Sequence, residues 1–335
     1  MSTSRIHAEV DFDADGKHAG FLRIPHSVHR SAYGWLPVPV ASVKSGDGPR
    51  VLLMSGNHGD EYEGQVALSK LIAALQPDDI NGQVIFLPMA NYPAAYAGLR
   101  TSPIDDGNLN RSFPGDPDGT PTMMIAHFIE HVVLSRVDTM LDLHSGGSSL
   151  MYIPSVQAQF EPDGSLSPQV RELVDAFDAP ISQVYAPGGE DRMSESAARR
   201  NGVVYITTEL GGAGTVTPGA LAVTERGLRR TLYRIGCLKS APPEANEKTT
   251  TRYVEVKGDD HYCYSSEIGL FEPLVSLGDE VVAGQPAAAV HFPETPLKSP
   301  LIVEFKGEGV VICQRFPGRV VRGDCLFHLG SDWPG

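Results

Sequence analysis

Short apolar runs alternate with helix-like spacing over the first 210 residues of the chain. Five runs have the length of buried strands, and they lie at residues 36–43, 51–54, 84–87, 139–143 and 203–209. Two stretches between them, residues 64–75 and 125–134, instead repeat their apolar residues at helical spacing. Strands that alternate with helices in this way are typical of an α/β sheet.

Polar residues with reactive side chains follow three of these predicted strands, after residue 54, at residue 144 and at residue 209. Ligands of α/β sheets bind beyond the carboxyl ends of the strands, so these polar residues are candidates for one shared site. We therefore expect a catalytic α/β domain over residues 1–240. It would contain a mixed sheet with helices on both faces.

The pattern changes near residue 240. Residues 239–251 are polar and contain two prolines without any periodicity, which indicates a linker. Beyond it, short β-like runs alternate with glycine, and residues 275–286 are weakly echoed by residues 319–327. We expect a small β-rich domain over residues 250–330 that resembles the barrel-sandwich shape of biotinyl and lipoyl carriers. Lys298 lacks a carrier-type hairpin, which favours a domain that caps the active site.

Composition and charge narrow the class of protein. The chain of 335 residues has no apolar run of membrane-spanning length, and its first residues are polar, so we expect a cytoplasmic protein without membrane contact. Its net charge of −14 disfavours nucleic-acid binding. The cysteines are too far apart for a Cys-x-x-Cys metal site. The oligomeric state stays open, and a homo-oligomer is compatible with the sequence.

The segment of residues 56–64 is the sharpest local motif. It places His58 and Glu61 three residues apart in a glycine-rich turn after a strand. Imidazole nitrogen and carboxylate oxygen both suit zinc, and catalytic zinc sites commonly use two histidines and one glutamate. Asp60 and Glu63 compete for the acidic position, although Glu63 also suits the start of a helix.

His144 is the candidate for the third metal ligand, because it ends an apolar strand and opens a glycine turn. Asp142 lies two residues earlier, on the same face of that strand. It could orient a metal-bound imidazole through a hydrogen bond. A structural histidine and a solvated aspartate are the alternatives for this pair.

Three further residue types suggest amide hydrolysis. Glu209 ends a strand and could transfer protons to and from a reacting group. Arg111 could grip a carboxylate by two bonds, with Asn110 adding another. Arg100 could stabilise an oxyanion near a metal. For each of these residues considered alone, an ordinary place on the surface is the alternative.

Read together, these motifs resemble the succinylglutamate desuccinylase/aspartoacylase family, which is related to the zinc carboxypeptidases. The family's motifs occur in order, namely Gly-x-His-Gly-x-Glu at 56–61, Asn-x-x-Ala at 91–94, Asn-Leu-Asn-Arg at 108–111, Asp-Leu-His-Ser at 142–145 and Thr-Glu-Leu-Gly at 208–211. The resemblance covers roughly residues 50 to 330. It implies one zinc ion per subunit and a small N-acyl amino acid as substrate.

The same resemblance implies a role for each motif residue. By it, His58, Glu61 and His144 are the zinc ligands, and Glu209 is the general base. Arg100 polarises the scissile carbonyl group, while Asn110 and Arg111 hold the substrate carboxylate.

Within the family, four segments are most similar to the members that deacetylate N2-acetyl-L-2,4-diaminobutanoate in ectoine breakdown, namely residues 31–39, 59–64, 100–105 and 208–212. The segment between Arg100 and Arg111 is longer than in aspartoacylase. Arg199 lies where aspartoacylase has a further carboxylate-binding arginine, but a predicted solvated helix carries it. A dicarboxylic substrate such as N-acetylaspartate is therefore not expected, and the resemblance implies a substrate with a basic side chain. The acids available to bind that side chain are Asp105, Asp106, Glu190 and Asp191, for which ordinary solvation on a loop is the alternative.

Three other functions remain open at this point. An aspartoacylase or desuccinylase would act on a different acyl amino acid with the same zinc chemistry. A metallocarboxypeptidase would need an open cleft, which the expected C-terminal domain would narrow. A non-catalytic carrier module would not need Glu209 beside three metal ligands.

Overall fold

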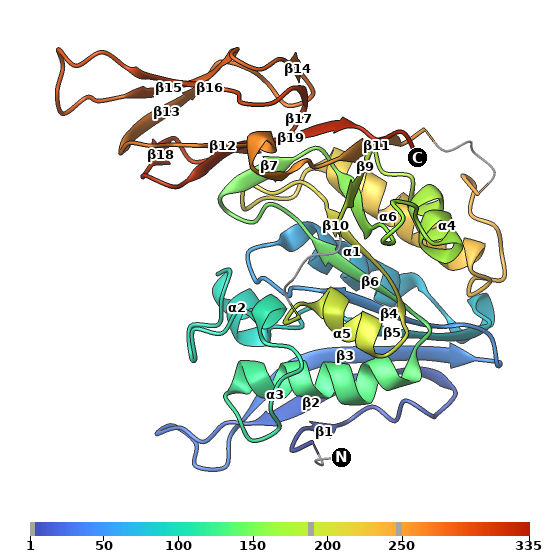
Figure 1. Cartoon of the computed structure of the whole chain (residues 1–335). Coiled ribbons are helices and arrows are strands. Elements are labelled where there is room, and N and C mark those ends of the chain that lie inside the picture. The colour runs from blue at the N-terminus through green and yellow to red at the C-terminus, as the bar shows by residue number, and fades with distance from the viewer. Residues whose placement is uncertain (1–3, 187–190, 246–249) are drawn as a thin grey trace.

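The computed structural model describes residues 4–186, 191–245 and 250–335. A long mixed sheet runs through the molecule, and helices cover both of its faces in the N-terminal two thirds of the chain (Figure 1). This arrangement confirms the predicted fold class. A second, smaller antiparallel sheet lies in the C-terminal part of the chain.

The main sheet contains both parallel and antiparallel neighbours. Its central strands β5, β4, β6 and β10 are parallel to one another, whereas β3 and β8 join this group antiparallel. From one edge, the order is β1 (His7–Ala8), β2 (Gly16–Pro25), β3 (Trp35–Ser45), β5 (Gly82–Leu87), β4 (Arg50–Ser55), β6 (Thr139–His144), β10 (Val204–Glu209), β8 (Ser155–Gln159), β9 (Ile181–Tyr185), β11 (Arg252–Glu255), β19 (Cys325–Asp332), β17 (Gly309–Arg315) and β14 (Glu280–Val281).

Side chains of the central strands point alternately to the two faces of the sheet, and each face has its own apolar core. In β4, Leu52 and Met54 pack on one face, while Val51 and Leu53 pack on the other. Helices α3 (Pro121–Phe128) and α5 (Ser194–Arg200) cover the first face. Helices α1 (Tyr62–Ala74), α4 (Pro168–Phe177) and α6 (Pro218–Arg234) cover the second. Short helical segments complete the chain, namely α2 (Tyr92–Ala97), η1 (Pro77–Asp79), η2 (Leu109–Arg111), η3 (Ile129–Val133), η4 (Leu134–Arg136) and η5 (Gly258–His261).

The predicted strands and the helix at residues 64–75 are present, with ends that differ by a few residues. The helix predicted at residues 125–134 begins earlier, at Pro121, because proline is favoured in the first turn although it adds no apolar periodicity. After Phe128 its turns widen into the π-helical segment η3. Among the described residues, no helix is both long and apolar enough to span a bilayer.

The C-terminal β-rich segment is joined to the main sheet by hydrogen bonds. Strand β11 pairs in parallel with β9 and antiparallel with β19, so the large sheet continues into this segment. The small sheet has the order β16 (Leu301–Glu304), β15 (Pro286–His291), β13 (Gly269–Pro273) and β18 (Arg319–Val320), and two outlying strands are β12 (Tyr262–Tyr264) and β7 (Leu150–Tyr152). A separate apolar core fills this segment. The division into domains at residues 240 and 250 stays a prediction.

A buried ion pair fastens the chain where it enters this segment. Asp178 ends α4 in a left-handed conformation with a φ of 54°, and one carboxylate oxygen lies 3.2 Å from Nη1 of the buried Arg230 in α6. The other oxygen accepts hydrogen bonds from the backbone N–H groups of Thr250 and Thr251, just before β11. The carboxylate of Asp178 therefore joins α4, α6 and the start of β11.

We expect Asp178→Asn to lower the free energy of unfolding by about 3 kcal/mol, because it removes a buried negative charge that lies next to the buried guanidinium of Arg230. Asparagine tolerates the left-handed backbone, so this variant separates the charge from backbone strain. Urea denaturation monitored by circular dichroism measures the change. Asp47→Asn in an exposed turn is the control and should stay within about 0.5 kcal/mol of the parent. A loss below about 1 kcal/mol for Asp178→Asn would contradict the structural role of the pair.

Candidate metal centre and active site

The carboxyl ends of three neighbouring parallel strands bring the candidate residues together. Strand β6 lies between β4 and β10, with Ser55 beside Leu143 and Glu209 beside His144 in the register. The turn after β4 packs so closely on α2 that any side chain at Gly59 would collide with the backbone of Ala94. This close packing turns His58 and the following residues back towards the end of β6.

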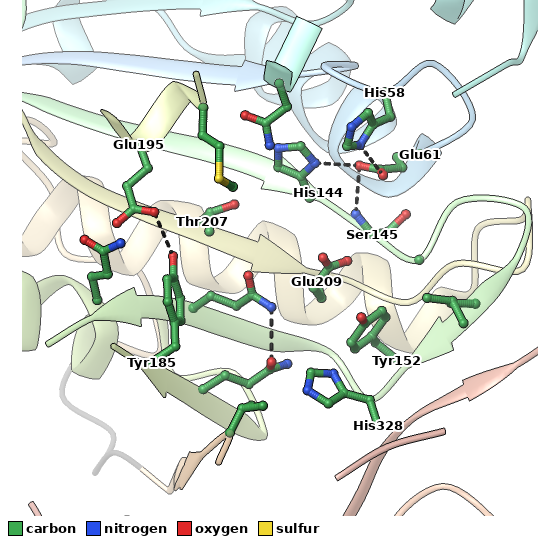
Figure 2. A pocket seen from close by; sticks show the side chains of 18 of the residues that line it. His58, Glu61, His144, Ser145, Tyr152, Tyr185, Glu195, Thr207, Glu209 and His328 are labelled. Atoms are coloured by element: carbon green, nitrogen blue, oxygen red, sulfur yellow. Dashed lines mark hydrogen bonds and ion pairs between the residues drawn. The ribbon is translucent and has the colours of Figure 1, made fainter. Parts of the chain in front are cut away.

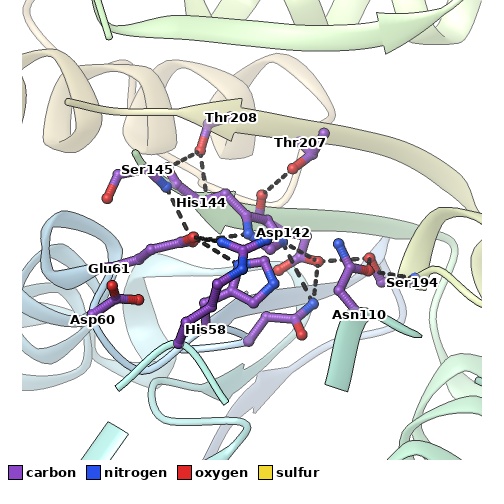
Figure 3. A network of polar contacts seen from close by, with 12 residues as sticks. His58, Asp60, Glu61, Asn110, Asp142, His144, Ser145, Ser194, Thr207 and Thr208 are labelled. Atoms are coloured by element: carbon purple, nitrogen blue, oxygen red, sulfur yellow. Dashed lines mark hydrogen bonds and ion pairs between the residues drawn. The ribbon is translucent and has the colours of Figure 1, made fainter. Parts of the chain in front are cut away.

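His58, Glu61 and His144 converge on a common point. The Nδ1 atom of His58 is 2.7 Å from Oε1 of Glu61, and the Nδ1 atom of His144 is 2.9 Å from Oε2 (Figure 3). One ligand atom from each of the three residues lies within 4.8 Å of the others, and all three side chains are buried. The geometry therefore brings together the three residues that the sequence predicts as metal ligands.

The carboxylate of Asp142 fixes the orientation of His144. Its Oδ2 atom lies 3.1 Å from Nε2 of His144, so this nitrogen carries the proton and Nδ1 faces Glu61. The same oxygen accepts hydrogen bonds from Nδ2 of Asn57 and from the hydroxyl group of Ser194 in α5. Asp142 thus makes the contact expected of a residue that orients a metal ligand.

The cluster carries a surplus of negative charge. Burial raises the pKa of Glu61, but the two histidines outweigh this effect and hold the pKa below its usual range. Burial lowers the pKa of His144, yet the carboxylates of Asp142 and Glu61 outweigh it and raise that pKa well above its usual value. Burial lowers the pKa of His58. Positive charge is therefore favoured between His144 and its two carboxylate neighbours.

These residues fit a metal ion in both chemistry and arrangement. Two imidazole nitrogens and one carboxylate form the donor set that catalytic zinc sites commonly use. The buried Nε2 atom of His58 has no hydrogen-bond partner among the described residues, so nothing there competes with the orientation that points Nδ1 at Glu61. A divalent cation would also balance the buried carboxylates.

The cluster forms one side of a cavity of about 710 Å³. All seven residues that the sequence predicts for the site line this cavity, namely His58, Glu61, Arg100, Asn110, Arg111, His144 and Glu209. Figure 2 shows the metal-ligand candidates above Glu209, with Glu195 and Tyr185 at one end of the cavity and His328 at the other. The cavity is large enough for a small amino acid derivative.

Glu209 is half-buried, and one oxygen of its carboxyl group is enclosed by the protein. Its Oε2 atom has no hydrogen-bond partner among the residues that the structure describes. Burial and the nearby Glu61 raise the pKa of Glu209 to about 8, against the opposite effects of His144 and Arg100. A carboxyl group in this environment can hold or release a proton near neutral pH.

The two predicted arginines have different surroundings. The Nη1 atom of Arg100 lies 3.5 Å from Oε1 of Glu61, with about half of its side chain exposed. Arg111 and Asn110 belong to the short segment η2, and Nη1 of Arg111 donates to the carbonyl oxygen of Asn110. The side-chain oxygen of Asn110 accepts a hydrogen bond from the backbone N–H of Ser194, whose hydroxyl oxygen lies 3.1 Å away. The amide donor of Asn110 is the part that can still serve a ligand.

Three of the four acids predicted to bind a basic side chain are described by the structure, and none of these three lines the cavity. Asp105 instead accepts hydrogen bonds from Ser102 and from the backbone N–H and hydroxyl group of Thr122. Within the described residues, neither Asp105 nor Asp106 lines the cavity. Asp191 is exposed and pairs with Arg199. The fourth acid, Glu190, lies outside the described residues.

Several cavity residues are not apparent from the sequence. Glu195 and Tyr185 line one end, and Tyr152, Tyr262 and His328 line the other. Burial lowers the pKa of His328 to about 3, and neither of its ring nitrogens has a partner among the described residues. His328 is therefore a neutral wall of the cavity. Only a polar residue inside an apolar strand at residues 325–332 could have indicated it.

The sequence is similar to known proteins of the family that its motifs resemble. Residues 47–235 match the succinylglutamate desuccinylase/aspartoacylase catalytic domain. The chain is 42% identical to the N-alpha-acetyl-L-2,4-diaminobutyric acid deacetylase of Halomonas elongata, over 96% of this chain and 94% of that protein.

Solved structures give the same result. The product-bound ectoine utilization protein EutE (DoeB) from Ruegeria pomeroyi superposes with a TM-score of 0.94 at 38% identity, over 99% of this chain and 100% of that one. A succinylglutamate desuccinylase/aspartoacylase from Rhodobacter sphaeroides has a TM-score of 0.93 at 38% identity, with the same coverage. The matched catalytic domain and this degree of similarity show that the chain belongs to the succinylglutamate desuccinylase/aspartoacylase family.

Proposed function

We propose that the protein is a zinc-dependent deacetylase of a small N-acetylated amino acid in the cytoplasm, with N2-acetyl-L-2,4-diaminobutanoate as its substrate. The observation that carries this proposal is the convergence of His58, Glu61 and His144 beside Glu209 in one cavity. The 42% identity to a deacetylase of that substrate supports the choice of acyl amino acid.

Zinc held by these three residues would supply Lewis-acid chemistry, which polarises a carbonyl oxygen and lowers the pKa of water. Glu209 would accept a proton from the attacking water and deliver it to the leaving nitrogen. The guanidinium group of Arg100, close to Glu61, would stabilise the negative charge that develops on the carbonyl oxygen.

Recognition of the amino acid would use the other side of the cavity. The planar guanidinium group of Arg111 suits the α-carboxylate, and the amide donor of Asn110 would add a further hydrogen bond. Arg199, which a dicarboxylic substrate could use, pairs with Asp191 on the surface. This arrangement favours a substrate with one carboxylate.

The C-terminal segment would complete the enclosure. Four residues of this segment line the cavity, namely Val256, Gly258, Tyr262 and His328. We propose that residues 250–330 act as a domain that caps the active site of a catalytic domain formed by residues 1–240. A closed end suits a small substrate better than a peptide.

The first prediction from the proposed function concerns the metal. Asp142→Asn should lower the affinity for zinc by about 10- to 100-fold, because His144 loses the carboxylate that orients its ring. His144→Ala should abolish stoichiometric binding. Isothermal titration of the metal-free protein with zinc measures both effects, and His131→Ala, at an exposed histidine outside the cluster, is the control. Unchanged zinc affinity in both variants would contradict the assigned site.

The second prediction concerns the proton carrier. Glu209→Gln should lower turnover by roughly 100-fold or more, since glutamine has nearly the same shape but cannot accept the proton. Zinc content measured by atomic absorption should remain that of the parent enzyme. If turnover stays within a few-fold of the parent while zinc is retained, Glu209 is not the base.

The third prediction concerns the substrate. We expect kcat/KM for the N2-acetyl derivative of diaminobutyrate to exceed those for the acetyl derivatives of aspartate and norvaline by at least about tenfold. Dipeptides with the same residues serve as substrates for the carboxypeptidase alternative and should be hydrolysed poorly. A preference for acetylaspartate would instead assign the protein as an aspartoacylase.

A further inference from the structure

We infer that Glu195 binds the side-chain ammonium group of the substrate and thereby selects N-acetylated amino acids with a short basic side chain. This inference rests on the proposed function. It assigns a specificity-determining residue at a position where the sequence suggested different acids.

Glu195 is the cavity carboxylate that the proposed chemistry leaves without a role. The cavity lining contains three carboxylates among the described residues. Glu61 belongs to the metal-binding cluster and Glu209 is the proposed base. Glu195 is only 8% exposed, yet its side chain lines the cavity at the end away from His328 (Figure 2).

One oxygen of Glu195 is held in place and the other is open to a ligand. The hydroxyl group of Tyr185, in β9, donates a hydrogen bond to Oε2 over 3.2 Å. No donor to Oε1 is found among the described residues. A buried carboxylate with one fixed oxygen and one open oxygen suits an ammonium group, which brings three donors and the opposite charge.

The position of Glu195 matches a short side chain. The residue before it, Ser194, donates its backbone N–H to Oδ1 of Asn110 over 2.9 Å, so the start of α5, which carries Glu195, is joined to the proposed carboxylate clamp. In diaminobutyrate, two methylene groups separate the α-carbon from the amine. If Asn110 and Arg111 hold the carboxylate of this substrate, its amine lies only a short distance from them. Glu195 is on the helix that is joined to Asn110, so it suits a short side chain.

The electrostatic environment agrees with this role. Burial raises the pKa of Glu195 to about 7, although the hydrogen bond from Tyr185 and the charge of Arg199 act in the opposite direction. Arg199 itself pairs with Asp191 on the exposed side of α5. Among the described residues, Arg199 is thus the cation that acts on this carboxyl group, and it is shared with Asp191, so a cationic ligand would add a charge partner inside the cavity.

The test compares two substrates of nearly equal shape, N2-acetyl-2,4-diaminobutyrate and N-acetylnorvaline, in which a methyl group replaces the ammonium group. Glu195→Gln should lower kcat/KM for the diaminobutyrate derivative by at least about 30-fold, because the buried charge pair is lost. The value for acetylnorvaline should stay within about threefold of the parent. Glu172→Gln, on the exposed side of α4, is the matched control and should change neither value.

The outcomes separate this inference from the function on which it rests. Equal losses on both substrates, or unchanged discrimination in Glu195→Gln, would overturn the role of Glu195 while the deacetylase assignment stands. Loss of discrimination in Asp191→Asn instead would overturn it as well. If the zinc-loaded parent hydrolyses neither acetyl amino acid, the proposed function fails and this inference fails with it. Unchanged zinc content and melting temperature confirm that Glu195→Gln is folded.

Discussion

A fully buried carboxylate, that of Asp142, is the constraint on which the site depends. Such a charge is tolerated inside a protein only when it is hydrogen-bonded, and Oδ2 of Asp142 obtains donors from three separate parts of the chain, while Oδ1 has no partner among the described residues. Asn57 comes from the turn after β4, His144 from the end of β6 and Ser194 from the start of α5. These three contacts with one oxygen therefore hold the metal-binding turn, the ring of His144 and the helix that carries Glu195 in fixed relative positions.

The three carboxylates of the cavity show how surroundings give one functional group different properties. Glu61 lies between two histidines, which lower its pKa, whereas burial and the nearby Glu61 raise the pKa of Glu209 to about 8. Glu195, beside a tyrosine hydroxyl group, has a pKa of about 7. Metal binding, proton transfer and recognition of a cation are distinct tasks, and each suits one of these environments. The chemistry of the site is thus distributed by burial and neighbours rather than by residue type.

The α/β core and the residues His58, Glu61, His144 and Glu209 could be predicted because their motifs directly follow apolar strands. Arg100, Asn110 and Arg111 instead follow the short helix α2, and their prediction depended on residue type and on the resemblance to the family. Parallel strands place their carboxyl ends at one edge, so order along the chain becomes proximity in space. Glu195 escaped prediction because its spacing to Arg199 is that of an ordinary solvent-exposed pair on a helix. His328 lines the cavity from β19, far along the chain from the other cavity residues. A local sequence pattern cannot indicate a contact between such distant segments. Asp105 was one of several possible partners for a basic side chain, and spacing along the chain cannot show that Thr122 already binds its carboxylate.

The continuation of the main sheet through β9, β11 and β19 has a consequence for how molecules enter and leave. Swinging the C-terminal wall away from the cavity would break the backbone hydrogen bonds of the β9–β11 ladder, which covers four residue pairs. The β9–β11 ladder therefore holds the C-terminal wall of the cavity in a fixed position relative to the main sheet. We therefore expect the size of the cavity entrance to limit which substrates can bind.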